Sequence, residues 1–190
     1  MQTERQAQII NISMEIIANK GIQGFTIKNI SKEIGISEPA IYRHFENKTA
    51  ILITILDNFK AMIGSSSSSL MDSENTAIGK IECMFSRMLT IFIEQPAIIS
   101  VIFSEEIFKS EIVLKNKILE IQNLNQARIE NIIEKGQADN NVRTDIDKST
   151  FALMFMGAFR LLVKRWDLND YNSNLKLEGG KLLNSFKLFI

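Results

Sequence analysis

Residues 26–49 constrain the fold of this chain more than any other stretch, because apolar residues recur there at helical spacing around a single glycine. Ile27, Ile30 and Ile34 are three and four residues apart, which places them along one side of a helix. Gly35 follows directly, and glycine adopts the left-handed backbone of a helix end without steric cost. The spacing predicts a short helix that ends at Gly35 and packs its isoleucines against a partner.

A second short helix is expected to begin immediately after this turn. Ser37 is a good N-cap, and Pro39 fits the first turn because its missing N–H would be unpaired there. Ile41 and Phe45 are four residues apart and should face the core, which leaves polar, aromatic and cationic side chains exposed. Such a helix pair has the geometry that places its second helix in the major groove of DNA. A plain helical corner with solvated charges is the alternative.

The residues that follow Phe45 favour the DNA-binding interpretation. Asn47 can cap a further helix, and Lys48 would then lie in its first turn. A cation at the positive end of a helix dipole costs about 0.3–1 kcal/mol. A phosphate beside the lysine and the free N–H groups would make the electrostatic free energy of this arrangement favourable. The pattern therefore predicts a contact with the DNA backbone.

The N-terminal helix, the helix-turn-helix and the pattern Tyr-x-His-Phe-x-x-Lys at residues 42–48 resemble the TetR family of bacterial transcriptional regulators. Residues 5–52 carry this resemblance, and the remainder matches in length and helical patterning. It implies an all-α fold with a three-helix helix-turn-helix DNA-binding domain at residues 1–47 and a helical ligand-binding and dimerisation domain at residues 48–190. The implied function is a sequence-specific regulator, most simply a ligand-responsive repressor that binds an inverted-repeat operator as a dimer, although activation is also compatible.

The resemblance also assigns DNA contacts to positions of this sequence. Those expected to touch phosphate or sugar are Thr26, Tyr42, His44 and Lys48. Those expected to help set sequence preference are Ser37, Glu38, Pro39, Ala40 and Arg43. Glu38 departs from the usual small residue or lysine, and its carboxylate would repel phosphate. It can accept a hydrogen bond from cytosine N4, or simply complement the helix dipole.

Helical period continues along the rest of the chain, which contains only two prolines, so an all-α fold is predicted throughout. A first helix is expected over about residues 4–20, and a helix that begins at Lys48, here called the lever helix, would link the N-terminal domain to the rest. Further helices are expected over about residues 74–94 and, after a short apolar segment through Phe103, over about residues 110–135 with Gly136 as the stop. Two more would begin after Asp145 or Asp147 and after Asn172. Gly64 and the serines at 65–69 favour early fraying of the lever helix, whereas the family favours helix there.

The last two expected helices are unusually apolar. They can close the core of a monomer, but the family resemblance favours a homodimer through a four-helix bundle of these two helices from each subunit.

A set of aromatic and thioether side chains matches positions that often line a ligand cavity in this family. The set is Met84, Phe85, Met88, Phe92, Phe103, Phe155 and Phe159. By spacing alone these residues are core, and a cavity among them would take a largely apolar small-molecule effector. Asn125 and Arg128 are candidate polar anchors if they point inward, although exposed positions are expected for both.

Other function classes find little support. The chain has one histidine and one cysteine, with no metal-ligand spacing and no phosphate-cradling glycine loop, so we expect no catalytic residues, metal or cofactor. The remaining alternative is a helical carrier of apolar ligands, or a protein-interaction module, without DNA binding. With no signal-peptide pattern and no apolar run near 18 residues, no membrane association is expected and the predicted location is the cytoplasm.

Overall fold

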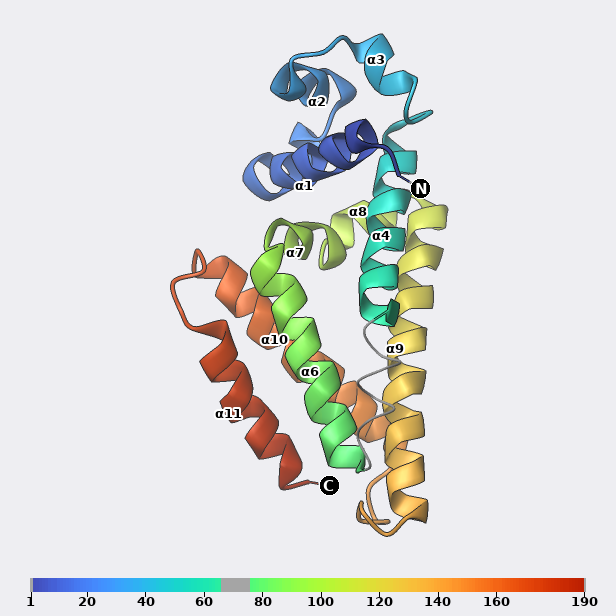
Figure 1. Cartoon of the computed structure of the whole chain (residues 1–190), viewed down its shortest axis with the longest axis vertical. Coiled ribbons are helices and arrows are strands. Elements are labelled where there is room, and N and C mark those ends of the chain that lie inside the picture. The colour runs from blue at the N-terminus through green and yellow to red at the C-terminus, as the bar shows by residue number, and fades with distance from the viewer. Residues whose placement is uncertain (1, 66–75, 190) are drawn as a thin grey trace. The chain divides into compact units, whose positions relative to one another are not determined.

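The computed structural model describes residues 2–65 and 76–189, and every regular element in these ranges is a helix (Figure 1). In chain order the helices are α1 (Glu4–Gly24), α2 (Ile27–Ile34), α3 (Glu38–Tyr42), α4 (Lys48–Ser65), α6 (Ala77–Glu94), α7 (Ala97–Ile102), α8 (Glu105–Ser110), α9 (Ile112–Ala138), α10 (Lys148–Leu168) and α11 (Leu175–Lys187). The predicted all-α fold is confirmed.

The chain divides into two compact units, and both are discontinuous in sequence. The first combines Met1–Lys60 with Gln95–Leu119, and the second combines Ala61–Glu94 with Glu120–Ile190. Helices α4 and α9 each have residues in both units. The sequence-based division into residues 1–47 and 48–190 concerns function and stays a prediction.

The first unit is organised around α1. The Thr3 hydroxyl accepts a hydrogen bond from the Gln6 N–H, and the Gln6 side chain accepts one from the Thr3 N–H, which completes a capping box. The helix is interrupted at Gly21, whose φ of 66° is not helical, one residue after the predicted end at Lys20. Helix α1 packs against α2 and, still more extensively, against α7. The three N-terminal helices therefore share their core with residues from the middle of the chain.

Polar contacts join α1 and α4 to residues 106–117 within this first unit. The Gln23 amide donates a hydrogen bond of 2.9 Å to Glu106 Oε1. At the start of α4, the Thr49 hydroxyl lies 3.1 Å from Glu111 Oε1. Further along α4, Asp57 forms an ion pair with Lys117 of α9.

The second unit is held together by an aromatic core among α6, α10 and α11. Phe85 of α6 meets Phe155 and Phe159 of α10 edge-on, with ring centroids 5.5 Å and 5.1 Å apart. Phe186 of α11 lies 5.1 Å from Phe155 by the same measure. These rings are buried, and such pairs add to the free energy gained from area burial alone.

Close approach of α6 and α11 depends on Gly179. A Cβ at this position would clash with Leu89 Cδ1 and lie 3.2 Å from Phe85 Cε1, so a side chain there would require Leu89 or the helix to shift. Gly180, the next residue, has no such neighbour within 4 Å.

Gly136 does not end α9, contrary to the prediction. The helix continues to Ala138, and the left-handed residue is Asn140, with a φ of 57°. Gly136 is instead a packing site, because a Cβ there would lie 2.6 Å from Ala77 Cβ. Its carbonyl accepts hydrogen bonds from the N–H groups of Asn141 and Val142.

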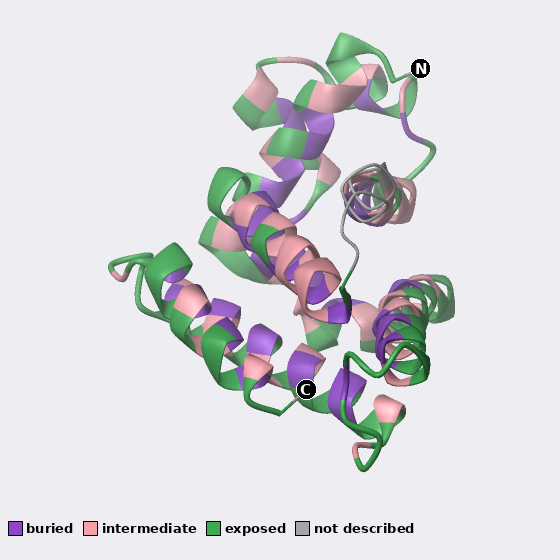
Figure 2. Cartoon of the chain, turned by 60° about the horizontal axis from the view of Figure 1, so that its bottom comes forward, coloured by how far each residue is buried: buried purple, intermediate pink, exposed green. Residues whose placement is uncertain are grey.

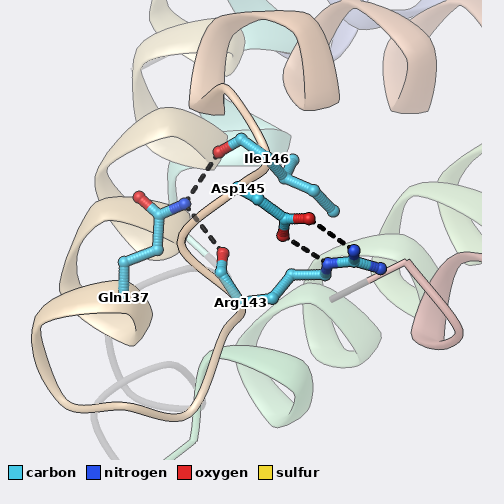
Figure 3. Close-up of polar contacts among 4 residues, drawn as sticks. All are labelled: Gln137, Arg143, Asp145 and Ile146. Carbon is cyan, nitrogen blue, oxygen red and sulfur yellow. Dashed lines mark hydrogen bonds and ion pairs between the residues drawn. The ribbon is translucent and has the colours of Figure 1, made fainter.

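The loop that joins α9 to α10 is fixed by side-chain contacts (Figure 3). The Gln137 amide donates to the carbonyls of Arg143 and Ile146, and Arg143 forms a paired contact with the Asp145 carboxylate. This contact lowers the pKa of Asp145. Asp147 then caps α10 by accepting from the Thr150 N–H, which lowers the pKa of Asp147.

The last two helices keep an apolar side that nothing in the described part of the chain covers. On α10 the exposed apolar residues are Leu153, Met154, Leu161 and Leu168, and at α11 they are Leu177, Leu188 and Phe189. Leu161 is 61% exposed and Leu188 is 83% exposed. In Figure 2, buried and exposed residues lie along different sides of the helices. We call these seven residues the α10–α11 apolar face.

The predicted fraying of the lever helix is tested only in part. Helix α4 includes Gly64 and Ser65. The serines at 66–69 lie outside the described residues, and so does the expected start of the next helix near residue 74. Among described residues no single helix is long and apolar enough to cross a membrane, and one bent pair, α6 with α7 and α8, passes on length and composition only.

Candidate nucleic-acid interface

The turn between α2 and α3 has the predicted geometry. Gly35 caps the end of α2 in the left-handed region, with φ 77° and ψ 33°, which confirms the role expected for glycine. At the other end of α2, the Thr26 side chain accepts a hydrogen bond of 3.1 Å from the Asn29 N–H. Thr26 is also exposed, so its hydroxyl keeps one side open to a partner.

Helix α3 is short, and two apolar residues hold it to the first unit. Ile41 is fully buried and Phe45 is 6% exposed, as their spacing predicted. Ser37 is the N-cap by backbone position, but its hydroxyl makes no capping hydrogen bond. Pro39 lies in the first turn, as expected.

The structure places most of the predicted DNA-contacting side chains at the surface. The exposed residues are Thr26, Ser37, Glu38, Pro39, Tyr42, Arg43 and Lys48, whereas Ala40 and His44 are half-buried. Tyr42 is 51% exposed, which is unusual for a large aromatic side chain that only fills a core. Apart from Thr26, which lies at the start of α2, these groups lie on α3 and its two flanks.

Two cations in this group are free to meet an anion. Asn47 caps α4 by accepting a hydrogen bond of 2.9 Å from the Ala50 N–H, and Lys48 is the first residue of that helix. Within residues 2–65 and 76–189, neither Arg43 nor Lys48 forms an ion pair. A helix start with free N–H groups and an unpaired lysine can bind a phosphate.

Sequence reasoning missed the contacts that support this surface from residues 95–119. Glu106 and Glu111 reach Gln23 and Thr49 across 83 and 62 positions of the chain. No local pattern signals a hydrogen bond between residues so far apart.

The described residues contain no group of three or more histidine, cysteine or acidic side chains able to hold a metal ion. Cys83 is a half-buried free thiol on α6, and His44 is the chain's single histidine.

Comparison with known sequences decides the family. Residues 9–55 match the family described as bacterial regulatory proteins, tetR family, and residues 57–184 match the C-terminal region of YsiA-like proteins. The chain belongs to the TetR family of bacterial regulatory proteins. It is therefore a DNA-binding transcriptional regulator, and the alternative of a carrier or interaction module without DNA binding is not favoured.

Relatives with established names are distant but extend over most of the chain. The fatty acid metabolism regulator protein of Bacillus subtilis is 25% identical over 171 residues, covering 88% of this chain and 86% of that protein. The nucleoid occlusion factor SlmA of Mannheimia succiniciproducens is 21% identical, covering 85% of this chain and 77% of that protein. As transcriptional regulators, members of this family are not enzymes.

Solved structures share the fold. The fatty acid degradation regulator FadR from Bacillus halodurans has a TM-score of 0.86 at 18% identity, with 98% of this chain and 96% of that chain covered. FadR from Bacillus subtilis in complex with stearoyl-CoA has a TM-score of 0.81 at 22% identity, with 95% and 96% covered.

Proposed function

We propose that this protein is a repressor that binds an inverted-repeat operator as a homodimer and releases it when an apolar-chain effector binds. The observation that carries the DNA-binding part is the exposed, unpaired group of Tyr42, Arg43 and Lys48 beside a capped helix start. We further propose that residues 1–47 form the DNA-binding domain, extended by the contact of Lys48, and that residues 48–190 bind the effector and the second subunit, within the cytoplasm where the DNA lies.

The contacts with DNA divide into two classes in this proposal. Thr26, Tyr42, His44 and Lys48 bind phosphate or sugar and fix the position of the protein. Ser37, Glu38, Pro39, Ala40 and Arg43 lie on or beside α3 and set sequence preference. Glu38 accepts a hydrogen bond from cytosine N4 where the operator provides one.

The homodimer is supported by the α10–α11 apolar face. A two-fold interface uses the same surface of both subunits, and two helices per subunit make a four-helix bundle. Dimerisation would place two copies of α3 about 34 Å apart, one turn of DNA, or a little more.

The effector class rests on relatives and on residue chemistry together. A relative is named a fatty acid metabolism regulator, and the FadR structure from Bacillus subtilis holds stearoyl-CoA. We therefore propose an effector with a long acyl chain.

Among the predicted cavity residues, Met84 and Met88 are the stronger candidates because both are half-buried on α6. Phe85, Phe92, Phe155 and Phe159 already pack against one another. Phe103 belongs to the other compact unit.

Transmission to DNA would pass along helices that have residues in both units. Helix α4 begins at the proposed phosphate contact Lys48 and ends at Ser65 in the second unit. An effector weakens DNA binding only if it binds more tightly to the conformer whose α3 helices are misplaced for the operator.

Selection of bound duplexes from a random DNA pool, at about 150 mM salt because affinity depends on salt, tests the proposal. Enrichment of an inverted repeat is the expected result. Palmitoyl-CoA added to that complex should then release the DNA. Absence of any enriched sequence would contradict the operator proposal, and retention of DNA with palmitoyl-CoA bound would contradict the proposed response.

A further inference from the structure

We propose that the second compact unit contains an oxyanion site formed by Arg87, Asn125 and Arg128, which binds the negatively charged head group of the effector. This inference rests on the proposed function, because it assumes that an effector binds this unit.

Arg87 is the strongest single observation. It lies on α6 and is half-buried, and its Nε atom is buried without a hydrogen-bond partner in the described residues. A guanidinium carries five N–H donors and no acceptor, so a buried Nε needs an acceptor from elsewhere. Burial of such a donor is unfavourable unless a partner satisfies it, and an anionic oxygen is the strongest partner.

Two more unpaired polar side chains come from α9. Asn125 lies four residues from Ile121 and four from Ile129, so it interrupts the buried apolar stripe of this helix. Arg128 is one turn further, and its Nη2 atom lies 3.8 Å from the position that a Cβ would take at Gly64 on α4. Both are half-buried rather than exposed as expected from sequence, and neither has a hydrogen bond or ion pair in the described part of the chain.

Counted from one contact between α6 and α9, these residues lie at similar heights along the two helices. The two helices run in opposite directions (Figure 1), and Ala77 of α6 packs against Gly136 of α9. From this contact, Arg87 is ten residues along α6, or about 15 Å at the rise of an α-helix. Asn125 and Arg128 are eleven and eight residues back along α9, or about 16 Å and 12 Å.

The surroundings specify an amphipathic anion rather than a small ion. Met84 and Ile91 lie three and four residues from Arg87 and share its side of α6, so apolar surface adjoins the cation. Two guanidinium groups and an amide N–H match the oxygens of a carboxylate or a phosphate, and the adjoining methionine and isoleucine match an alkyl chain. A fatty acid supplies the carboxylate, and an acyl-CoA supplies phosphates.

Direct binding of three ligands to the full-length protein tests the site. The ligands are palmitate, palmitoyl-CoA and the uncharged methyl palmitate, measured by calorimetry or fluorescence on the wild type and on Arg87→Met and Arg128→Met. We expect each variant to weaken an anionic ligand by about 10- to 100-fold, which is the effect of losing one charged hydrogen bond. Methyl palmitate should bind all of these proteins equally well. Loss for palmitate identifies the carboxylate as the bound group, and loss for palmitoyl-CoA alone identifies the phosphates.

Controls separate this site from general effects of charge and folding. Lys135→Met removes an exposed cation from the same helix α9 and should leave all affinities unchanged. Arg87→Lys keeps the charge and should bind anions more tightly than Arg87→Met, with thermal melts confirming that each variant is folded. Equal affinity of every variant for the anionic ligands would overturn the site while leaving the proposed function intact. Failure of the wild type to bind any of the three ligands would overturn both this site and the proposed class of effector.

Discussion

The positive charge of Lys48 is unfavourable for the helix that contains it. The lysine is the first residue of α4, beside the positive end of the helix dipole, and it has no ion pair in the described residues. We expect Lys48→Ala to weaken binding to all DNA sequences alike and to reduce the slope of log K against log salt by about 1. Titrations at several salt concentrations measure this slope.

Lys176→Ala is the matched control, since Lys176 is an exposed lysine at the start of α11 and its loss changes the net charge equally. An unchanged salt slope in Lys48→Ala, or an equal change in Lys176→Ala, would remove Lys48 from the phosphate contacts.

Asp147 makes stability depend on pH through one helix cap. The Thr150 N–H binds the carboxylate in the folded state, and this hydrogen bond lowers the pKa of Asp147. Because the folded pKa is below the unfolded one, about 3.9, the contribution to stability is present above that value and is lost as pH falls through the folded pKa. We therefore expect Asp147→Asn, which can still cap α10, to lose less stability than the wild type between pH 6 and pH 3 in urea unfolding.

Asp139→Asn provides the comparison, because it removes an exposed carboxylate from the same loop without removing the cap. The assignment fails if both variants respond to acid in the same way.

Residues whose role is set by their immediate neighbours in sequence were predictable. Gly35, Asn47 and Asp147 act at helix ends, where turn geometry and capping involve only the next few residues. Arg87 was not predictable, since helical spacing does not reveal that its Nε is buried without a partner. Helical spacing likewise gave no sign that Asn125 and Arg128 are half-buried, and both were expected to be exposed.

At the scale of helices, contact between α6 and α11 depends on the absence of a side chain at Gly179. A methyl group there would meet Leu89 and Phe85 at distances too short for normal packing. We expect Gly179→Ala to reduce the free energy of unfolding by about 1–3 kcal/mol, the usual cost of overpacking a core. Gly180→Ala adds a methyl group where there is space, and should leave stability unchanged or raise it by about 0.5–1 kcal/mol.

Chemical denaturation of both variants measures the difference between these neighbouring positions. An equal change of stability in the two variants, for example the gain that helix propensity alone predicts for Gly→Ala, would show that contact with α6 does not determine the effect.

Helix boundaries were predicted well where a cap or a break is local, and less well at Gly136. The sequence offers glycine as a helix stop, but packing against Ala77 explains this glycine, and α9 continues to Ala138. A glycine required for close approach looks the same in sequence as a glycine required for a turn.

At the scale of the whole chain, the composition of the compact units could not be read from the sequence. The N-terminal helices share a unit with residues 95–119, because α1 packs against α7. Contacts between segments so far apart follow from the fold alone.

A fragment of residues 1–60 would expose the side of α1 that α7 covers, so we expect it to lack the cooperative thermal unfolding of the full chain. A sharp melting transition of this fragment would contradict that dependence.

The α10–α11 apolar face gives the last prediction, which concerns the assembly. Its leucines are far more exposed than core leucines, and burial of each would contribute about 1.5–3 kcal/mol. We expect Leu161→Glu combined with Leu188→Glu to convert a dimer into a folded monomer, because each charge would be buried twice in a two-fold interface. Sedimentation measures the mass, and circular dichroism checks that the helices remain.

Leu119→Glu places the same charge at an exposed leucine of α9 and should leave the dimer intact. Since one half-site binds weakly alone, the monomer should also lose most of its affinity for an inverted repeat. A double variant that remains dimeric would assign the interface to another surface.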